Sequence, residues 1–229
     1  MEKDLTRYTK VDIIGPGVWF SFHLIAKRGT RTDLERMVDH LRKTFPCEEC
    51  RSHFTKMSHR HDLDKVKDID LFKKVYEMHA IVNKRLEKAT PPFEDVVDFF
   101  EDYRAVRGAL VRLTDPKVIG PGIWWMLHSS AEHNPTFFER LWDMLLNYFP
   151  CEECREEINR YERREEVCQF GRSNYPQYVW NLHDEINIKL GKTSPGVDIV
   201  IDFFRKNEAC KVGCTSKSNE EILAHGRYV

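Results

Sequence analysis

The hexapeptide FPCEEC occupies residues 45–50 and recurs at residues 149–154, and an arginine follows it in both places. An identity of this length that includes a proline and two cysteines is very improbable by chance in a chain of 229 residues. The hexapeptide therefore marks a repeated structural unit, and the extent of that unit decides the domain organisation of the chain.

The similarity continues on both sides of the hexapeptide. Upstream, IIGPGVWFSFHLIA at residues 13–26 matches VIGPGIWWMLHSSA at residues 118–131. Downstream, residues 76–88 match residues 180–192, and a DFF triplet recurs after each of them. We predict unit 1 over residues 10–105, a linker over 106–117, unit 2 over 118–206 and a polar tail over 207–229.

Composition indicates an ordinary soluble, folded protein. Hydrophobic residues make up 41% of the chain and charged residues 32%, and 36 Lys and Arg balance 37 Asp and Glu. Because the basic residues are scattered, we expect no nucleic-acid partner. The N-terminal residues contain no apolar signal-peptide core, and no window reaches the ~20 apolar residues of a membrane helix. We therefore expect no membrane partner and a cytosolic or nuclear protein.

Each unit has the sequence pattern of a helical bundle. In unit 2, helices are predicted from near Pro121, over residues 137–148, from Pro150 onward and over residues 178–190, where Gly191 supplies a C-terminal stop. Strand-type alternation is missing from the sequence, which argues against a thioredoxin-like α/β fold around the Cys-x-x-Cys pairs. The predicted fold class is all-α, with two tandem bundles of four or five helices.

Four of the seven cysteines lie in the hexapeptides, as Cys47 and Cys50 and as Cys151 and Cys154. Each pair directly follows a proline, which is favoured in the first turn of a helix. The thiols would then lie at a helix N-terminus, where free N–H groups and the helix dipole stabilise a thiolate and lower the cysteine pKa. In a chain without a secretion signal, such pairs indicate redox chemistry or metal binding.

The alternative to a redox role is a zinc-binding structural or interaction module that uses both pairs. Zinc modules usually place their two pairs ~15–20 residues apart. Here the pairs lie in separate units, so we favour redox chemistry and predict no metal.

Aromatic and imidazole side chains share predicted helix faces in both units. Trp19 and His23 are four residues apart, and the same spacing recurs in unit 2. Each such residue alone indicates packing, because tryptophan and histidine on an apolar face usually belong to the core. Together with the nearby dithiol and a lysine, they would suit a flat, aromatic, phosphate-bearing cofactor.

The order Trp-x-x-x-His, Pro-Cys-x-x-Cys and Trp-x-x-His-x-x-x-Asn-x-x-Leu-Gly-Lys resembles the Erv/ALR family of FAD-linked sulfhydryl oxidases, here in two tandem copies. The resemblance covers roughly residues 15–100 and 120–204. It implies small helical bundles that wrap FAD around four core helices and pack as an intramolecular pseudo-dimer, with a further homodimer left open. It also implies an enzyme that forms disulfides in protein dithiols and passes electrons to O2, giving hydrogen peroxide.

The resemblance assigns roles to individual residues. Cys154 would be the flavin-proximal sulfur and Cys151 the sulfur that exchanges with incoming thiols, with Cys50 and Cys47 in the matching positions of unit 1. The residues implied to line the FAD sites are Gly120, Trp124, His128, Trp180, His183, Asn187 and Lys192 in unit 2, and Trp19, His23, His79, Asn83 and Lys88 in unit 1.

Unit 1 departs from the family pattern at Tyr76, which replaces a tryptophan, and at Glu87, which replaces a glycine. A glutamate disfavours the left-handed conformation with which Gly191 would end its helix. We therefore expect unit 2 to be the working site and treat unit 1 as a candidate degraded copy that keeps its cysteines without the flavin. His53 resembles a histidine that follows the Cys pair in some members.

The remaining cysteines are Cys168, a spare thiol, and Cys210 and Cys214 in the tail. The tail pair is a candidate for the mobile shuttle that relays electrons to the flavin-proximal pair in many members, and an incidental or structural pair is the alternative.

The resemblance also implies partners and a setting. The implied partners are protein dithiols, with a small redox carrier protein among the candidates. Tandem forms without a secretion signal resemble those encoded by large DNA viruses. This implies a cytoplasmic protein of the host cell or virion, with the mitochondrial intermembrane space as the alternative.

Overall fold

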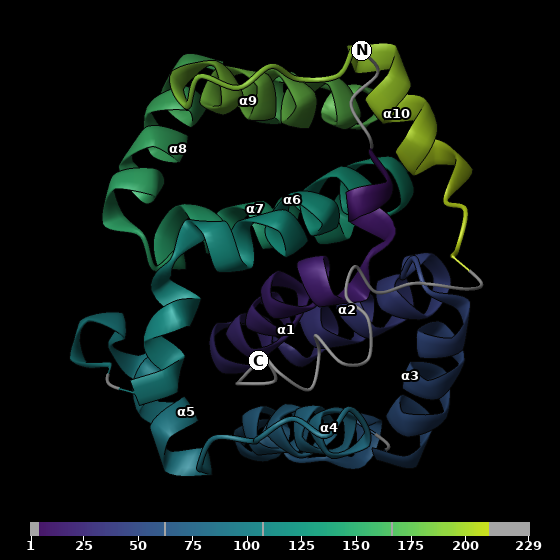
Figure 1. Cartoon of the computed structure of the whole chain (residues 1–229), viewed down its shortest axis with the longest axis vertical. Helices are drawn as coiled ribbons and strands as arrows, with labels where there is room; N and C mark the ends of the chain where they lie inside the picture. The colour runs from purple at the N-terminus through teal and green to yellow at the C-terminus, as the bar shows by residue number, and fades with distance from the viewer. Residues whose placement is uncertain (1–4, 62, 107, 166, 211–229) are drawn as a thin grey trace.

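The computed structural model describes residues 5–61, 63–106, 108–165 and 167–210 (Figure 1). Within these residues the chain forms α-helices and short 3-10 helices and no β-strand, so the predicted all-α class is confirmed. None of the described helices is both long and apolar enough to span a lipid bilayer.

The two units repeat one order of helices. The helices of unit 1 are α1 (Val11–Arg28), α2 (Arg31–Thr44), α3 (Glu48–His61), α4 (Leu71–Arg85) and α5 (Phe93–Glu101). Those of unit 2 are α6 (Pro116–His133), α7 (Pro135–Tyr148), α8 (Glu152–Glu165), α9 (Tyr175–Lys189) and α10 (Val197–Lys206). The 3-10 helix η1 (Leu5–Thr9) precedes α1, and η5 (Gly108–Thr114) lies between the units. In Figure 1, α4 and α9 lie at opposite ends of the molecule.

Local sequence explains where the helices begin and end. Thr30 and Asp33 form a capping box at the start of α2, and Asn134 caps α7 by accepting a hydrogen bond from the Phe137 amide at 3.2 Å. Both α2 and α7 end one residue before the phenylalanine of FPCEEC, which is the C-cap, because the proline that follows lacks an amide hydrogen to continue the helix. The chain then turns directly into α3 or α8, which carries the cysteine pair.

The units meet where α1 crosses α6, at the centre of Figure 1. The second glycine of each GPG motif makes this contact. A Cβ atom on Gly17 would lie 2.0 Å from the carbonyl oxygen of Ile119, and a Cβ on Gly122 would lie 2.0 Å from that of Ile14. No side chain fits at that distance, so these two glycines set how closely the helices pack.

A second contact joins α2 to unit 2. The ring of His40 packs 6.2 Å from that of Trp125 and 5.4 Å from that of Phe137, and Arg140 donates to the buried carboxylate of Asp33 at 3.2 Å. The buried apolar residues of both units form one continuous cluster. The two bundles therefore pack as an intramolecular pseudo-dimer with a shared core.

Candidate redox site

Each cysteine pair closes a disulfide at the N-terminus of a helix, Cys47–Cys50 at α3 and Cys151–Cys154 at α8. The amide of Cys50 points at the Cys47 sulfur at 3.2 Å, and the amide of Cys154 points at the Cys151 sulfur at the same distance. An N–H group directed at this sulfur favours its thiolate when the disulfide is reduced. The predicted placement of both pairs at helix N-termini is confirmed.

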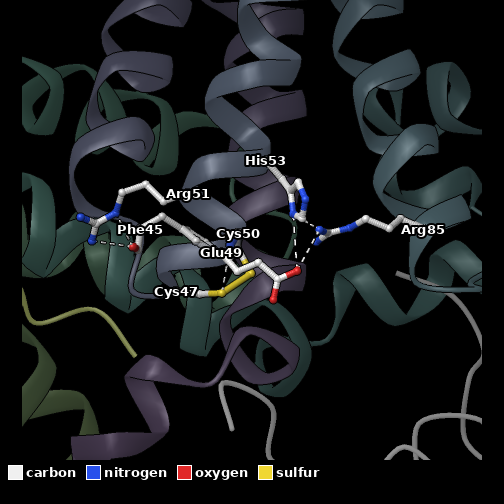
Figure 2. Close-up of a disulfide and its surroundings, with 7 residues drawn as sticks. All are labelled: Phe45, Cys47, Glu49, Cys50, Arg51, His53 and Arg85. Atoms are coloured by element: carbon white, nitrogen blue, oxygen red, sulfur yellow. Dashed lines mark hydrogen bonds and ion pairs between the residues drawn. A yellow bond between two sulfur atoms is a disulfide. The ribbon is translucent and has the colours of Figure 1, made fainter. Parts of the chain in front are cut away.

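The arginine after each hexapeptide holds the turn before the disulfide. Arg51 donates to the Phe45 carbonyl from Nε at 3.0 Å and from Nη2 at 2.8 Å (Figure 2). Arg155 makes the equivalent bond to the Phe149 carbonyl at 2.6 Å. The sequence repeats this arginine but gives no indication of its role, because the carbonyl it binds belongs to a turn that forms only in the folded chain.

In both units a tryptophan of the first helix stacks on a histidine of the fourth. The rings of Trp19 and His79 lie 4.1 Å apart at an interplanar angle of 3°, and those of Trp124 and His183 lie 3.9 Å apart at 1°. The predicted residues on α1 and α4, and on α6 and α9, are thus brought together. Each stack forms a flat aromatic surface of the kind that binds a planar ring system.

A second histidine lies behind each stack. His23 Nε2 is 3.1 Å from His79 Nδ1, and His128 Nε2 is 3.0 Å from His183 Nδ1. Burial lowers the pKa of His23 and of His183 to about 3, and it holds the pKa of His79 and His128 well below the usual value. All four imidazoles are therefore neutral at physiological pH, and in each pair one nitrogen donates to the other.

A cavity of about 380 Å³ opens between α1, α3 and α4 of unit 1. It brings together the predicted residues Cys50, Trp19, His79, Asn83 and Lys88. The volume lies in the ~300–1,000 Å³ range typical of cofactor sites. Cys50 and not Cys47 lines the cavity, which fits the expected roles of the two sulfurs. His23 lines a smaller neighbouring cavity together with Tyr76.

His79 also carries an unmet hydrogen-bonding atom. Its Nε2 is buried and has no hydrogen-bond partner among the residues described. A buried polar atom without a partner costs about 1–3 kcal/mol. The aromatic stack and the basic residues of the wall make unit 1 a chemical fit for a flavin dinucleotide.

The replacement of tryptophan by Tyr76 preserves the local structure. Trp180 Nε1 donates to the Pro195 carbonyl at 3.0 Å, and the Tyr76 hydroxyl donates to the Pro91 carbonyl at 2.7 Å. The same loop is therefore tied to the fourth helix in both units.

The prediction that Glu87 would disrupt the left-handed helix end of unit 1 is wrong. Glu87 adopts a left-handed conformation with φ 55°, close to the 66° of Gly191. In both units the amide of the following lysine, Lys88 or Lys192, then donates to the carbonyl of Asn83 or Asn187 at 2.8 Å. The left-handed state costs roughly 1–2 kcal/mol for a residue with a Cβ, and the surrounding hydrogen bonds hold it nevertheless. This departure therefore gives no reason to regard unit 1 as degraded.

The tail approaches the disulfide of unit 1. The Cys210 amide donates to the Pro46 carbonyl at 2.9 Å, and the Glu48 amide donates to the Cys210 carbonyl at 3.2 Å, which forms a parallel bridge with Cys47. Cys47 is only 2% exposed. Cys214 lies outside the described residues, as does the side chain of Cys168.

The zinc alternative requires both pairs as thiolates at one ion. In the structure each pair is instead closed in its own disulfide. Across the described residues, no group of three or more His, Cys, Asp and Glu side chains is placed to hold a metal ion.

Comparison with known proteins gives one family. The sequence pattern of the Erv1 / Alr family matches the chain twice, over residues 16–104 and over residues 121–208. Each match includes one cysteine pair, one Trp–His stack and the fifth helix of its unit, α5 or α10. No solved structure matches the chain.

Proposed function

The chain belongs to the Erv1/Alr family, and from this premise we propose that it is an FAD-dependent sulfhydryl oxidase that forms disulfides in protein dithiols. The electrons pass to O2, giving hydrogen peroxide. The observation that carries the proposal is the position of Cys50, whose disulfide with Cys47 borders a cavity walled by the Trp19–His79 stack.

The thiol chemistry follows from the disulfides. A substrate thiolate attacks the first sulfur of a pair, Cys47 or Cys151, and the bond between the two protein sulfurs breaks. The second cysteine leaves as a thiolate, and a mixed disulfide joins substrate and protein. The second substrate thiol then displaces the protein sulfur, so two substrate thiols become one disulfide and the protein disulfide becomes a dithiol.

FAD, when bound, would take the electron pair of this dithiol and transfer it to O2. The protein contributes binding and orientation. The Trp19–His79 stack supplies a flat apolar wall. Lys88 is one of the basic residues that would hold the phosphates. Because the stacked imidazole is neutral, it contributes shape and no charge.

The tail is proposed as the relay between substrate and unit 1. The bridge between Cys210 and Cys47 supports this role, because it places the backbone of one tail cysteine beside the cysteine expected to exchange. Replacing Cys210 by Ser should slow the oxidation of a folded protein dithiol several-fold. The matched control Glu208→Gln, at an exposed position two residues earlier, should retain the wild-type rate. Equal rates for Cys210→Ser and wild type would remove the relay.

For the setting, we propose a cytoplasmic site of action, in host cell or virion if the protein is viral. The substrates would be protein dithiols, and a small redox carrier protein would fit the same chemistry.

The central experiment measures flavin content and oxygen consumption together. Purified protein should be yellow and should consume O2 when given a dithiol, with one hydrogen peroxide formed for each disulfide. Replacing Cys50 and Cys154 together by Ser should abolish oxygen consumption, because no protein dithiol can then form, while the flavin stays bound. A colourless protein that contains stoichiometric zinc would disprove the oxidase and support the interaction module.

A further inference from the structure

We propose that each chain binds one flavin, in unit 1, and that ion pairs close the equivalent space in unit 2. The inference rests on the proposed function and specifies which of the two similar bundles performs the flavin chemistry. It reverses the preference for unit 2 that the motifs give.

The wall of the unit 1 cavity is strongly basic. Among the described residues that line it, Lys56, Arg60, Arg85 and Lys88 face the single carboxylate of Asp12. The pyrophosphate of FAD is anionic, and arginine and lysine bind phosphate oxygens by charge-assisted hydrogen bonds. The cavity therefore offers the charge that this part of the cofactor needs, next to the aromatic stack that suits its rings.

At one pair of equivalent positions, the two units carry different residues, and this changes the charge between the third and fourth helices. In unit 1, Arg85 donates to Nδ1 of His53, as Figure 2 shows. Arg85 also lies 3.6 Å from Glu49, whose side chain is 76% exposed, so this ion pair is weak. In unit 2, the corresponding contact joins Lys189 to Glu157. The position that His53 occupies in unit 1 thus carries a carboxylate, Glu157, in unit 2.

A second exchange adds another carboxylate to unit 2. Glu185 occupies the position of Ile81, which lines the unit 1 cavity. Both of its oxygens accept from Nη2 of Arg164, at 2.9 and 2.8 Å, and Lys189 donates to it at 2.8 Å. The contacts of Glu185 and Glu157 therefore connect α8 to α9 across the gap in which the cofactor would lie. A pyrophosphate would have to displace these carboxylates from their cations and would be repelled by them.

Two further observations, independent of these charges, also favour unit 1. The ring of His79, which carries an unmet nitrogen, lines the cavity. The tail that follows unit 2 ends its described course beside Cys47 and not beside Cys151. The tail and the cavity thus both contact the same disulfide-bonded pair, Cys47–Cys50.

The test compares the flavin content of two variants at equivalent positions. Arg60→Glu reverses a charge in the unit 1 cavity, and Arg164→Glu makes the same change in unit 2. Flavin released from each purified protein is quantified per chain, and far-UV circular dichroism establishes that each variant is folded. We expect one flavin per chain in the wild type and in Arg164→Glu, and about tenfold or more weaker flavin retention in Arg60→Glu, because a charge-assisted contact becomes a repulsion.

The outcomes separate this inference from the proposed function. Two flavins per wild-type chain, or loss of the flavin from Arg164→Glu alone, would overturn the assignment and leave the oxidase intact. A folded wild-type protein that takes up no added FAD would overturn both. If Arg60→Glu fails to fold, Lys56→Glu tests the same wall, with Arg160→Glu as its counterpart in unit 2.

Discussion

At the scale of single residues, one buried histidine lies at the junction of the two units, away from the residues that line the unit 1 cavity. His40 is 2% exposed at the junction of the two units, and its Nε2 has no hydrogen-bond partner among the residues described. Burial, with a smaller contribution from the charge of His133, lowers the pKa of His40 to about 3. The native state therefore holds this imidazole neutral, whereas the unfolded chain protonates it near its usual pKa of about 6.5.

This difference predicts a loss of stability in acid. Between pH 6.5 and 3 the unfolded state binds the extra proton, so the stabilisation is complete above pH 6.5 and falls as the pH drops through this window. From pH 7 to pH 5, His40 alone should account for roughly 2 kcal/mol of lost unfolding free energy. Urea unfolding at both pH values should show a smaller loss for His40→Gln than for wild type. Phe137→Leu, a neighbouring change without a titratable group, should keep the wild-type loss, and an unchanged loss in His40→Gln would contradict the assignment.

At the scale of elements, the repeated GPG motif shows which features of the fold can be predicted from the sequence and which cannot. The repeat itself and the helices near it were predictable from patterns in the chain. The role of the second glycine was not, because the oxygen that excludes a side chain at Gly122 belongs to Ile14, in the other unit. Contacts between segments that are distant in the chain leave no local pattern.

Because α1 and α6 cross closely, alanine substitutions at two glycines of α6 should have different effects on stability. Gly122→Ala should destabilise the protein by about 1–3 kcal/mol, since the added methyl group would overlap the Ile14 carbonyl and force the helices apart. Gly120→Ala meets nothing within 4 Å and should instead be neutral or stabilise by roughly 0.5–1 kcal/mol, because alanine favours the helix. Urea unfolding of the two variants measures both effects, and a neutral Gly122→Ala would rule out the tight crossing.

At the scale of the whole molecule, the sequence predicts the symmetry of the chain better than its asymmetry. The two Trp–His stacks and the two disulfides follow from motifs that repeat. The difference in charge between the two bundles depends on pairs such as Glu157 and Lys189, which lie on different helices and meet only when α8 packs beside α9. The motifs favoured unit 2 because of Gly191, but this glycine affects only the end of a helix. Glu87 adopts nearly the same backbone conformation at the matching position of unit 1.

The bridge between Cys210 and Cys47 affects which thiols can reach the disulfide of unit 1. With Cys47 2% exposed beside the tail, small thiols dissolved in the surrounding medium have little direct access to the sulfur they would need to attack. In a reducing compartment this shielding would keep abundant low-molecular-weight thiols from reducing the Cys47–Cys50 disulfide directly. The half-buried Cys151 has no equivalent cover among the described residues. The two identical hexapeptides would thus differ in which reductants can reach them.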